Sequence, residues 1–160
     1  MTTVNELQVI TKAWREVNEQ IGIKDPLPVI EASEEDMGGP NFGIHYDPNT
    51  LVPDSVQFTS GVLKLIVKGS LKGLLAHELG HYVLKQAPGF IWDAPDYQKE
   101  LDADNYATGL GYGEELIKDD EDKIIRWGDN NTGDHPTFLA RINNMKQTEK
   151  KLGPFLYPTA

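Results

Sequence analysis

The sequence of 160 residues contains no cysteine. Without thiols the chain can form neither disulfide bonds nor a thiolate metal site, so any metal ion must be bound by histidine or carboxylate side chains. Histidine is also scarce, with four residues in the whole sequence. The spacing of these few histidines is therefore informative about function.

Long apolar runs and an excess of positive charge are missing as well. No run of about 18 apolar residues exists, and the amino terminus has no basic segment followed by an apolar one, so we expect neither a membrane span nor a secretion signal. We therefore expect a cytoplasmic protein. The formal net charge of -10 argues against nucleic acid or an anionic membrane as the main partner.

The length and the content of 39% hydrophobic residues predict one domain, residues 1–160, with one core. Apolar residues at helical spacing and helix-capping signals predict helices at residues 4–21, 71–86, 96–110 and 136–152. Short β-like runs between turn signals predict strands at residues 28–32, 42–46 and 56–59. The acidic stretches 34–36 and 119–122 are interpreted as solvated loops. These elements predict an α+β fold with a small twisted sheet over helix 71–86.

The segment GLLAHELGHYVL, residues 73–84, contains two histidines and a glutamate within an apolar helical run. His77 and His81 are four residues apart, so they leave the same helix face one turn apart and can bind one ion together. Glu78 can reach a water molecule at that ion rather than the ion itself, which is the arrangement of the His-Glu-x-x-His motif. A surface histidine pair is the alternative, but the surrounding leucines indicate a buried helix, where unpaired polar groups are costly.

A catalytic zinc site usually has three protein ligands and one open position, so a third ligand is expected. Glu100 follows His81 by 19 residues and is the predicted third ligand. Asp104, one turn further on the same face, is predicted to accept the second ring N–H of a ligand histidine. Both could instead be ordinary surface carboxylates. Rival third ligands are Asp93, Asp96 and Asp102.

Three motifs, HELGH, ELDADNYA and HPTFLARI, follow one another at residues 77–81, 100–107 and 135–142. This set resembles the gluzincin metallopeptidases of the HtpX and CAAX prenyl endopeptidase type, whose signature is HExxH, then ExxAD, then an HP segment followed by RI. Residues 56–65 resemble the strand and turn before the active helix, and the resemblance spans about residues 38–145. Because the chain lacks membrane-spanning helices and has a short spacer after HELGH, it is more similar to the compact soluble gluzincins, sometimes called minigluzincins.

The resemblance implies a zincin-like fold and a zinc-dependent endopeptidase that acts on peptides or unfolded protein. One Zn²⁺ per chain would polarise the scissile carbonyl, with Glu78 as the general base. His135 is implied as the hydrogen-bond donor to the oxyanion, held by Arg141, and Tyr106 and Tyr112 are less supported alternatives. The residues around His135 also fit a turn and helix cap without chemistry, and His135 could instead bind the zinc and keep the enzyme latent.

Peptide substrates of zincins lie along an edge strand above the active helix. The segment Asn41, Phe42 and Gly43 is the predicted substrate-binding strand, with a plain turn as the alternative. Trp92 and Trp127 are interpreted as core residues rather than as cleft residues.

A second function class stays open, namely a latent or non-catalytic zincin-fold protein that captures a peptide partner. The intact Glu78 favours the enzyme, because a structural zinc site needs no carboxylate beside its ligand and normally closes with four protein ligands. The sequence does not determine the oligomeric state.

Overall fold

The computed structural model describes residues 4–90, 95–129 and 136–152, and within them the fold is α+β, as predicted. The elements in chain order are α1 (Val4–Glu19), β1 (Val29–Ala32), α2 (Glu34–Met37), β2 (Phe42–Tyr46), β3 (Pro53–Thr59), the 3-10 turn η1 (Val62–Lys64), α3 (Leu71–Gln86), α4 (Asp96–Ala107), the π-helical segment η2 (Thr108–Tyr112), α5 (Gly113–Trp127) and α6 (Phe138–Leu152). The predicted helix 71–86 and strand 42–46 agree with α3 and β2 residue for residue.

Helix α5 was not predicted, and the interpretation of residues 119–122 as a solvated loop is wrong. Asp119 is fully buried on this helix, where its carboxylate accepts a hydrogen bond from the Val67 backbone N–H at 3.2 Å. The same carboxylate pairs with Lys123, one turn further on, at 2.8 Å. Because Asp119 and Asp120 are buried on this helix, the segment is a packed helix despite its charge. The other acidic stretch, residues 34–36, forms the exposed start of the short helix α2.

The sheet has the strand order β1-β3-β2, so β3 is central and β2 is an edge strand. Strand β1 pairs parallel with β3, and β2 pairs antiparallel with it, with Phe42 opposite Phe58 and Ile44 opposite Val56. Val56 and Phe58 are fully buried, as expected for alternate residues on the inner face of a strand.

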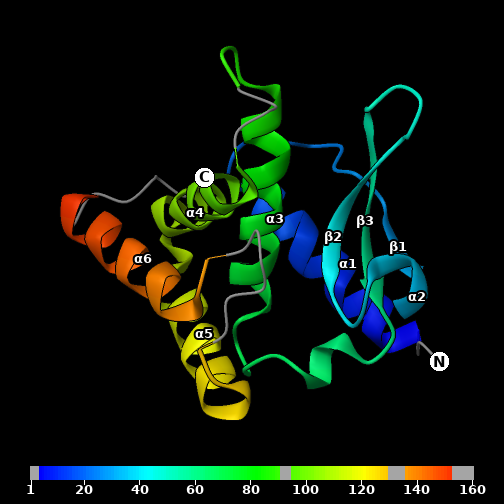
Figure 1. Cartoon of the computed structure of the whole chain (residues 1–160). Coiled ribbons are helices and arrows are strands. Elements are labelled where there is room, and N and C mark those ends of the chain that lie inside the picture. Colours follow the sequence, from blue (N-terminus) through cyan, green and yellow to red (C-terminus); the bar gives the residue numbers. More distant parts are fainter. Residues whose placement is uncertain (1–3, 91–94, 130–135, 153–160) are drawn as a thin grey trace.

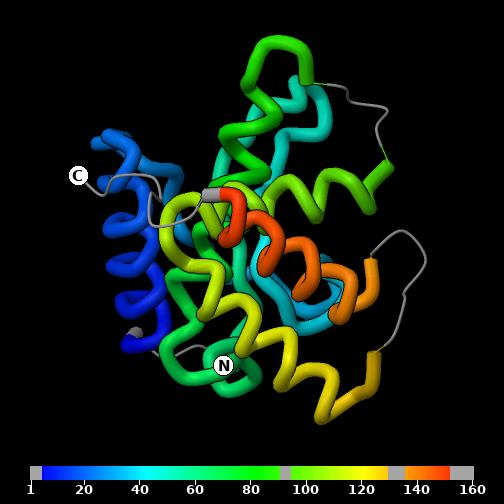
Figure 2. The backbone as a smooth tube through the Cα atoms, turned by 90° about the vertical axis from the view of Figure 1, so that its left-hand side faces the viewer, coloured from blue at the N-terminus to red at the C-terminus, as the bar shows by residue number. Residues whose placement is uncertain are grey.

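Helix α3 lies at the centre of the molecule, with the sheet and α1 on one side and α4, α5 and α6 on the other (Figure 1). Its buried residues Leu75 and Leu79 belong to one core together with Trp14 of α1 and Met145 of α6. Helices α5 and α6 run side by side, as the turned view shows (Figure 2). No helix in the described part of the chain is both long and apolar enough to cross a membrane.

Two glycines determine how α4 meets its neighbours. A Cβ at Gly80 of α3 would lie 3.1 Å from both the Ala103 carbonyl oxygen and the Tyr106 Cβ, so glycine here favours the close approach of α3 and α4. Gly111 has a φ of 101°, in the left-handed region, inside the π-helical segment. This residue lets the chain turn from α4 into α5.

Candidate active site

The structure brings together His77, His81 and Glu100, which were predicted as metal ligands from separate motifs. The two Nε2 atoms are 3.1 Å apart. One Glu100 oxygen lies 3.0 Å from the Nε2 of His77, and the other lies 3.3 Å from the Nε2 of His81. One possible ligand atom from each of the three side chains lies within 4.8 Å of the other two. The group can hold a metal ion.

The donor set fits zinc. Two imidazoles and one carboxylate form a common ligand set of catalytic zinc, and ligand bonds of about 2.0–2.1 Å in a tetrahedron separate the ligand atoms by about 3.3 Å. The two histidine nitrogens, 3.1 Å apart, are close to this separation, and each lies 3.0 or 3.3 Å from a different oxygen of Glu100. The three side chains are therefore gathered closely enough to bind one ion.

Asp104 lies behind the cluster and is fully buried. One of its oxygens is 2.7 Å from the Nδ1 of His77, so Asp104 meets the histidine nitrogen that faces away from the cluster, as predicted. Arg141 of α6 donates two hydrogen bonds of 2.8 Å to the same carboxylate. Arg141 thus binds Asp104. The predicted contact of Arg141 with His135 involves a residue outside the described part of the chain and stays a prediction.

The electrostatics of the cluster follow from burial and from these pairs. Burial lowers the pKa of His77, but the charge of Asp104 and the hydrogen bonds with Asp104 and Glu100 outweigh it and raise the pKa to about 10. Burial raises the pKa of Glu100, but the hydrogen bonds from the two histidines hold it well below its usual range. Burial raises the pKa of Glu78, which makes its carboxylate a stronger base.

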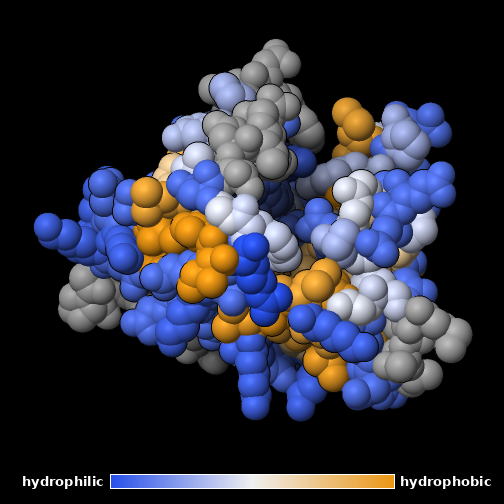
Figure 3. Space-filling model, turned by 60° about the horizontal axis from the view of Figure 1, so that its bottom comes forward, coloured by the Kyte–Doolittle hydropathy of each residue, from blue (hydrophilic) through white to orange (hydrophobic). Residues whose placement is uncertain are grey.

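A cleft of about 530 Å³ opens at the cluster and is lined by Glu78 as well as by the three candidate ligands. Asn41 and Phe42, two of the predicted substrate-binding residues, line it, whereas Gly43 is not among its lining residues. A smaller cavity of about 260 Å³ is also lined by His81 and Glu100 and is bordered by β2 and the start of α4. The edge strand therefore borders both cavities. Apolar side chains reach the surface in patches on the face shown in Figure 3.

The rival ligands and the alternative oxyanion donors lie outside the ligand group or outside the described residues. Asp96 and Asp102 are exposed on α4 and do not belong to the ligand cluster. The Tyr112 hydroxyl donates a hydrogen bond to Gln20, and Tyr106 packs on Gly80. His135, Asp93 and Trp92 lie outside the described residues.

The prediction that Trp127 belongs to the core is wrong. The side chain is 54% exposed and lines the larger cavity. Trp127 is the last residue of α5, directly before the helix ends at Gly128, so it lies beyond the part of α5 that packs on the core.

Tyr46 and Asp120 are among the cavity residues that were not predicted. Asp120 lines the larger cavity from a segment that was interpreted as a loop, so no sequence signal identified it. The sequence did contain a signal for Tyr46. In the predicted strand 42–46, Tyr46 lies on the same face as Phe42 and Ile44, and that face is turned toward α3.

No protein-family model, curated protein or solved structure matches this chain.

Proposed function

We propose that this protein is a zinc-dependent endopeptidase of the gluzincin type with a zincin-like fold, and that it hydrolyses peptide bonds of extended polypeptide. The observation that supports this most strongly is the meeting of His77, His81 and Glu100 in a cleft that Glu78 also lines. A purely structural metal site has no need for a carboxylate next to its ligand or for an open cleft around it.

Each side chain has a role in this proposal. His77, His81 and Glu100 would hold the ion, which when bound supplies a Lewis acid that polarises a carbonyl and activates water. Glu78 takes a proton from the attacking water and delivers it to the leaving amine. Its raised pKa, caused by burial, favours the first of these two steps. Asp104, fixed by Arg141, holds the Nδ1–H of His77 so that the Nε2 faces the ion.

The edge strand β2 is the proposed binding site of the substrate backbone. A peptide added to this edge would receive hydrogen bonds from main-chain groups and pass in front of Glu78. Because such bonds do not depend on side chains, we expect a broad set of unfolded or extended substrates. His135 stays a candidate donor to the oxyanion.

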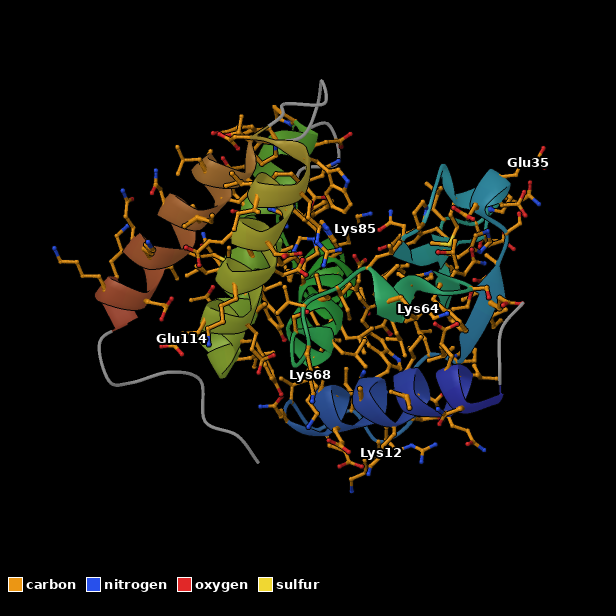
Figure 4. The ribbon with its side chains drawn as sticks, turned by 90° about the horizontal axis from the view of Figure 1, so that it is seen from below. Lys12, Glu35, Lys64, Lys68, Lys85 and Glu114 are labelled. Carbon is orange, nitrogen blue, oxygen red and sulfur yellow. The ribbon has the colours of Figure 1, made fainter. Side chains whose placement is uncertain are left out.

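The first experiment compares the wild type with Glu78→Gln after zinc loading, using a diverse peptide mixture and mass spectrometry. We expect cuts by the wild type, none by Glu78→Gln, and equal zinc content in both, because the substitution removes the base but no ligand. The matched control is Glu35→Gln, an exposed position on α2 that points away from the molecule (Figure 4). This variant should cleave like the wild type.

The same experiment can refute the proposal. A wild type that binds zinc and cleaves no peptide would favour the alternative, a binding protein of the same fold that captures a peptide partner. Cuts that persist in Glu78→Gln would show that Glu78 is not the base.

A further inference from the structure

Tyr46 is the last residue of β2 and borders the smaller cavity at the metal cluster. The pairing of β2 with β3 is regular up to His45 and shifts register between His45 and Tyr46. The extra residue at this shift is Asp54 of β3, so Tyr46 keeps the side of β2 that Phe42 and Ile44 share. Tyr46 lies against α3, the helix of the HELGH motif.

The ring of Tyr46 has a well-defined environment. The Nζ of Lys85 lies 4.2 Å from the centre of the ring, and Lys85 follows His81 by one turn of α3. Lys85 thus extends between β2 and α4 (Figure 4). These contacts hold the ring on the helix face that also presents Glu78 and His81.

The hydroxyl of Tyr46 is buried and has no hydrogen-bond partner in the structure of the described residues. An unpaired buried hydroxyl costs about 1–3 kcal/mol. Buried polar groups without a partner are rare in natural structures. One explanation for such a group is a partner that is present only in a complex. Solvent does not reach the hydroxyl in the free protein, so a partner is expected only when the side chain turns toward the adjacent cavity, which is also lined by Glu78, His81 and Glu100.

We propose that Tyr46 is a catalytic residue whose hydroxyl donates a hydrogen bond to the carbonyl oxygen of the scissile peptide bond as that oxygen becomes an oxyanion. This inference rests on the proposed hydrolytic function. A hydrogen-bond donor to the charge that develops on the oxyanion is among the strongest contributions to catalysis of acyl transfer. The proposal adds a second candidate donor, on the strand before the active helix, to His135.

The reaction balances with Tyr46 as a donor only. The oxygen of water forms a bond to the carbonyl carbon, the C–N bond breaks, and Glu78 carries a proton from the water to the amine. Tyr46 keeps its proton throughout. Burial, together with the negative charge of Glu78, raises the pKa of Tyr46 to about 12, so the hydroxyl is protonated at neutral pH.

Tyr46→Phe is an informative variant because it removes only the hydroxyl. We expect kcat on the best-cleaved peptide to fall about 100-fold, with KM changed by less than about threefold, because the lost bond forms in the transition state. Zinc affinity should not change. The melting temperature of the metal-free protein should stay equal or rise, because the hydroxyl has no partner to lose. Tyr97→Phe, at a 45% exposed tyrosine of α4, is the control and should behave like the wild type.

The outcomes separate this inference from the proposed function. An active wild type with an equally active Tyr46→Phe variant overturns the role of Tyr46 and leaves the peptidase intact. A lower melting temperature of Tyr46→Phe indicates a structural role and also overturns it.

If the wild type cleaves nothing, binding of a zinc-directed phosphinic peptide, whose tetrahedral oxygens imitate the oxyanion, is measured by calorimetry. Affinity about tenfold weaker in Tyr46→Phe supports the donor role. Equal affinity, or no binding to either protein, overturns it.

Discussion

Asp104 shows how a single buried carboxylate can organise a candidate metal site. It accepts hydrogen bonds from Arg141 while it contacts the Nδ1 of His77, and no part of it is exposed. Burial raises its pKa, but the charge and hydrogen bonds of Arg141 outweigh burial and lower the pKa to about 2. The carboxylate is therefore charged at neutral pH and accepts the Nδ1 proton of His77. Because the pKa of His77 is about 10, the metal-free ring carries a proton on both nitrogens at neutral pH, and an ion that binds Nε2 would replace the second proton.

Asp120, near the same arginine, has the opposite titration behaviour. Burial raises the pKa of Asp120 to about 7, and Arg141, at 4.0 Å, opposes this only in part. An aspartate in the unfolded chain titrates near 3.9. Between about pH 4 and pH 7 the folded chain therefore binds a proton that the unfolded chain has released, so this group makes stability fall as the pH rises through that window.

Asp120→Asn should remove this pH dependence. We expect the free energy of unfolding of the variant, relative to the wild type, to increase between about pH 4 and pH 8 by on the order of 2–4 kcal/mol. Urea denaturation at the two pH values measures the difference. Glu121→Gln, at an exposed neighbour on the same helix, is the control and should not alter the pH profile. A gain of equal size at both pH values would contradict the assignment.

At the level of helices, the contact between α3 and α4 determines the distance between the two halves of the ligand set. The histidines belong to α3 and Glu100 belongs to α4, and Gly80 lies at the point where these helices nearly touch. The sequence predicted both helices from apolar spacing and from the breakers after each, and it predicted the ligand set from the motifs. It did not predict the close contact at Gly80, because glycine within a helical pattern gives no local sign of which neighbour needs the space.

Gly80→Ala should separate α3 from α4. The new methyl group would lie 3.1 Å from backbone and side-chain atoms of α4, and relieving such overlap costs about 1–3 kcal/mol. We expect a lower melting temperature and at least tenfold weaker zinc binding, measured by chelator competition. Gly73→Ala is the matched control on α3, because its methyl group would meet Glu115 and Leu116 of α5 instead. It should lower stability while zinc affinity is kept. Equal zinc affinity in both variants would argue against the geometric role of Gly80.

Considering the whole molecule, the missed helix α5 explains why the cavity walls could not be derived from the sequence. The buried acidic residues Asp119 and Asp120 belong to α5 and follow no simple apolar pattern. Their places depend on partners from distant parts of the chain, such as the backbone of Val67 and the side chain of Arg141. Local propensity contains no information about such partners, whereas the α3 motif carries its chemistry within five residues.

The group of candidate ligands connects different helices, so zinc binding can be tested through stability, without a substrate. The ligands come from α3 and α4, and α6 supports them through Arg141. In the unfolded chain Glu100 and Arg141 are no longer held beside the two histidines, so zinc should bind the folded form much more tightly. At a free zinc concentration of 100 times Kd, binding adds about 2.7 kcal/mol of stability.

For a domain of this size that gain corresponds to a rise in melting temperature of roughly 5–10 °C over the protein in EDTA. Differential scanning calorimetry of both forms measures the shift. The Glu100→Gln variant, which lacks the third ligand, should show a much smaller shift at the same zinc concentration. If zinc raised the melting temperature of wild type and variant equally, the ion would bind elsewhere, and the role of Glu100 in holding it would have to be abandoned.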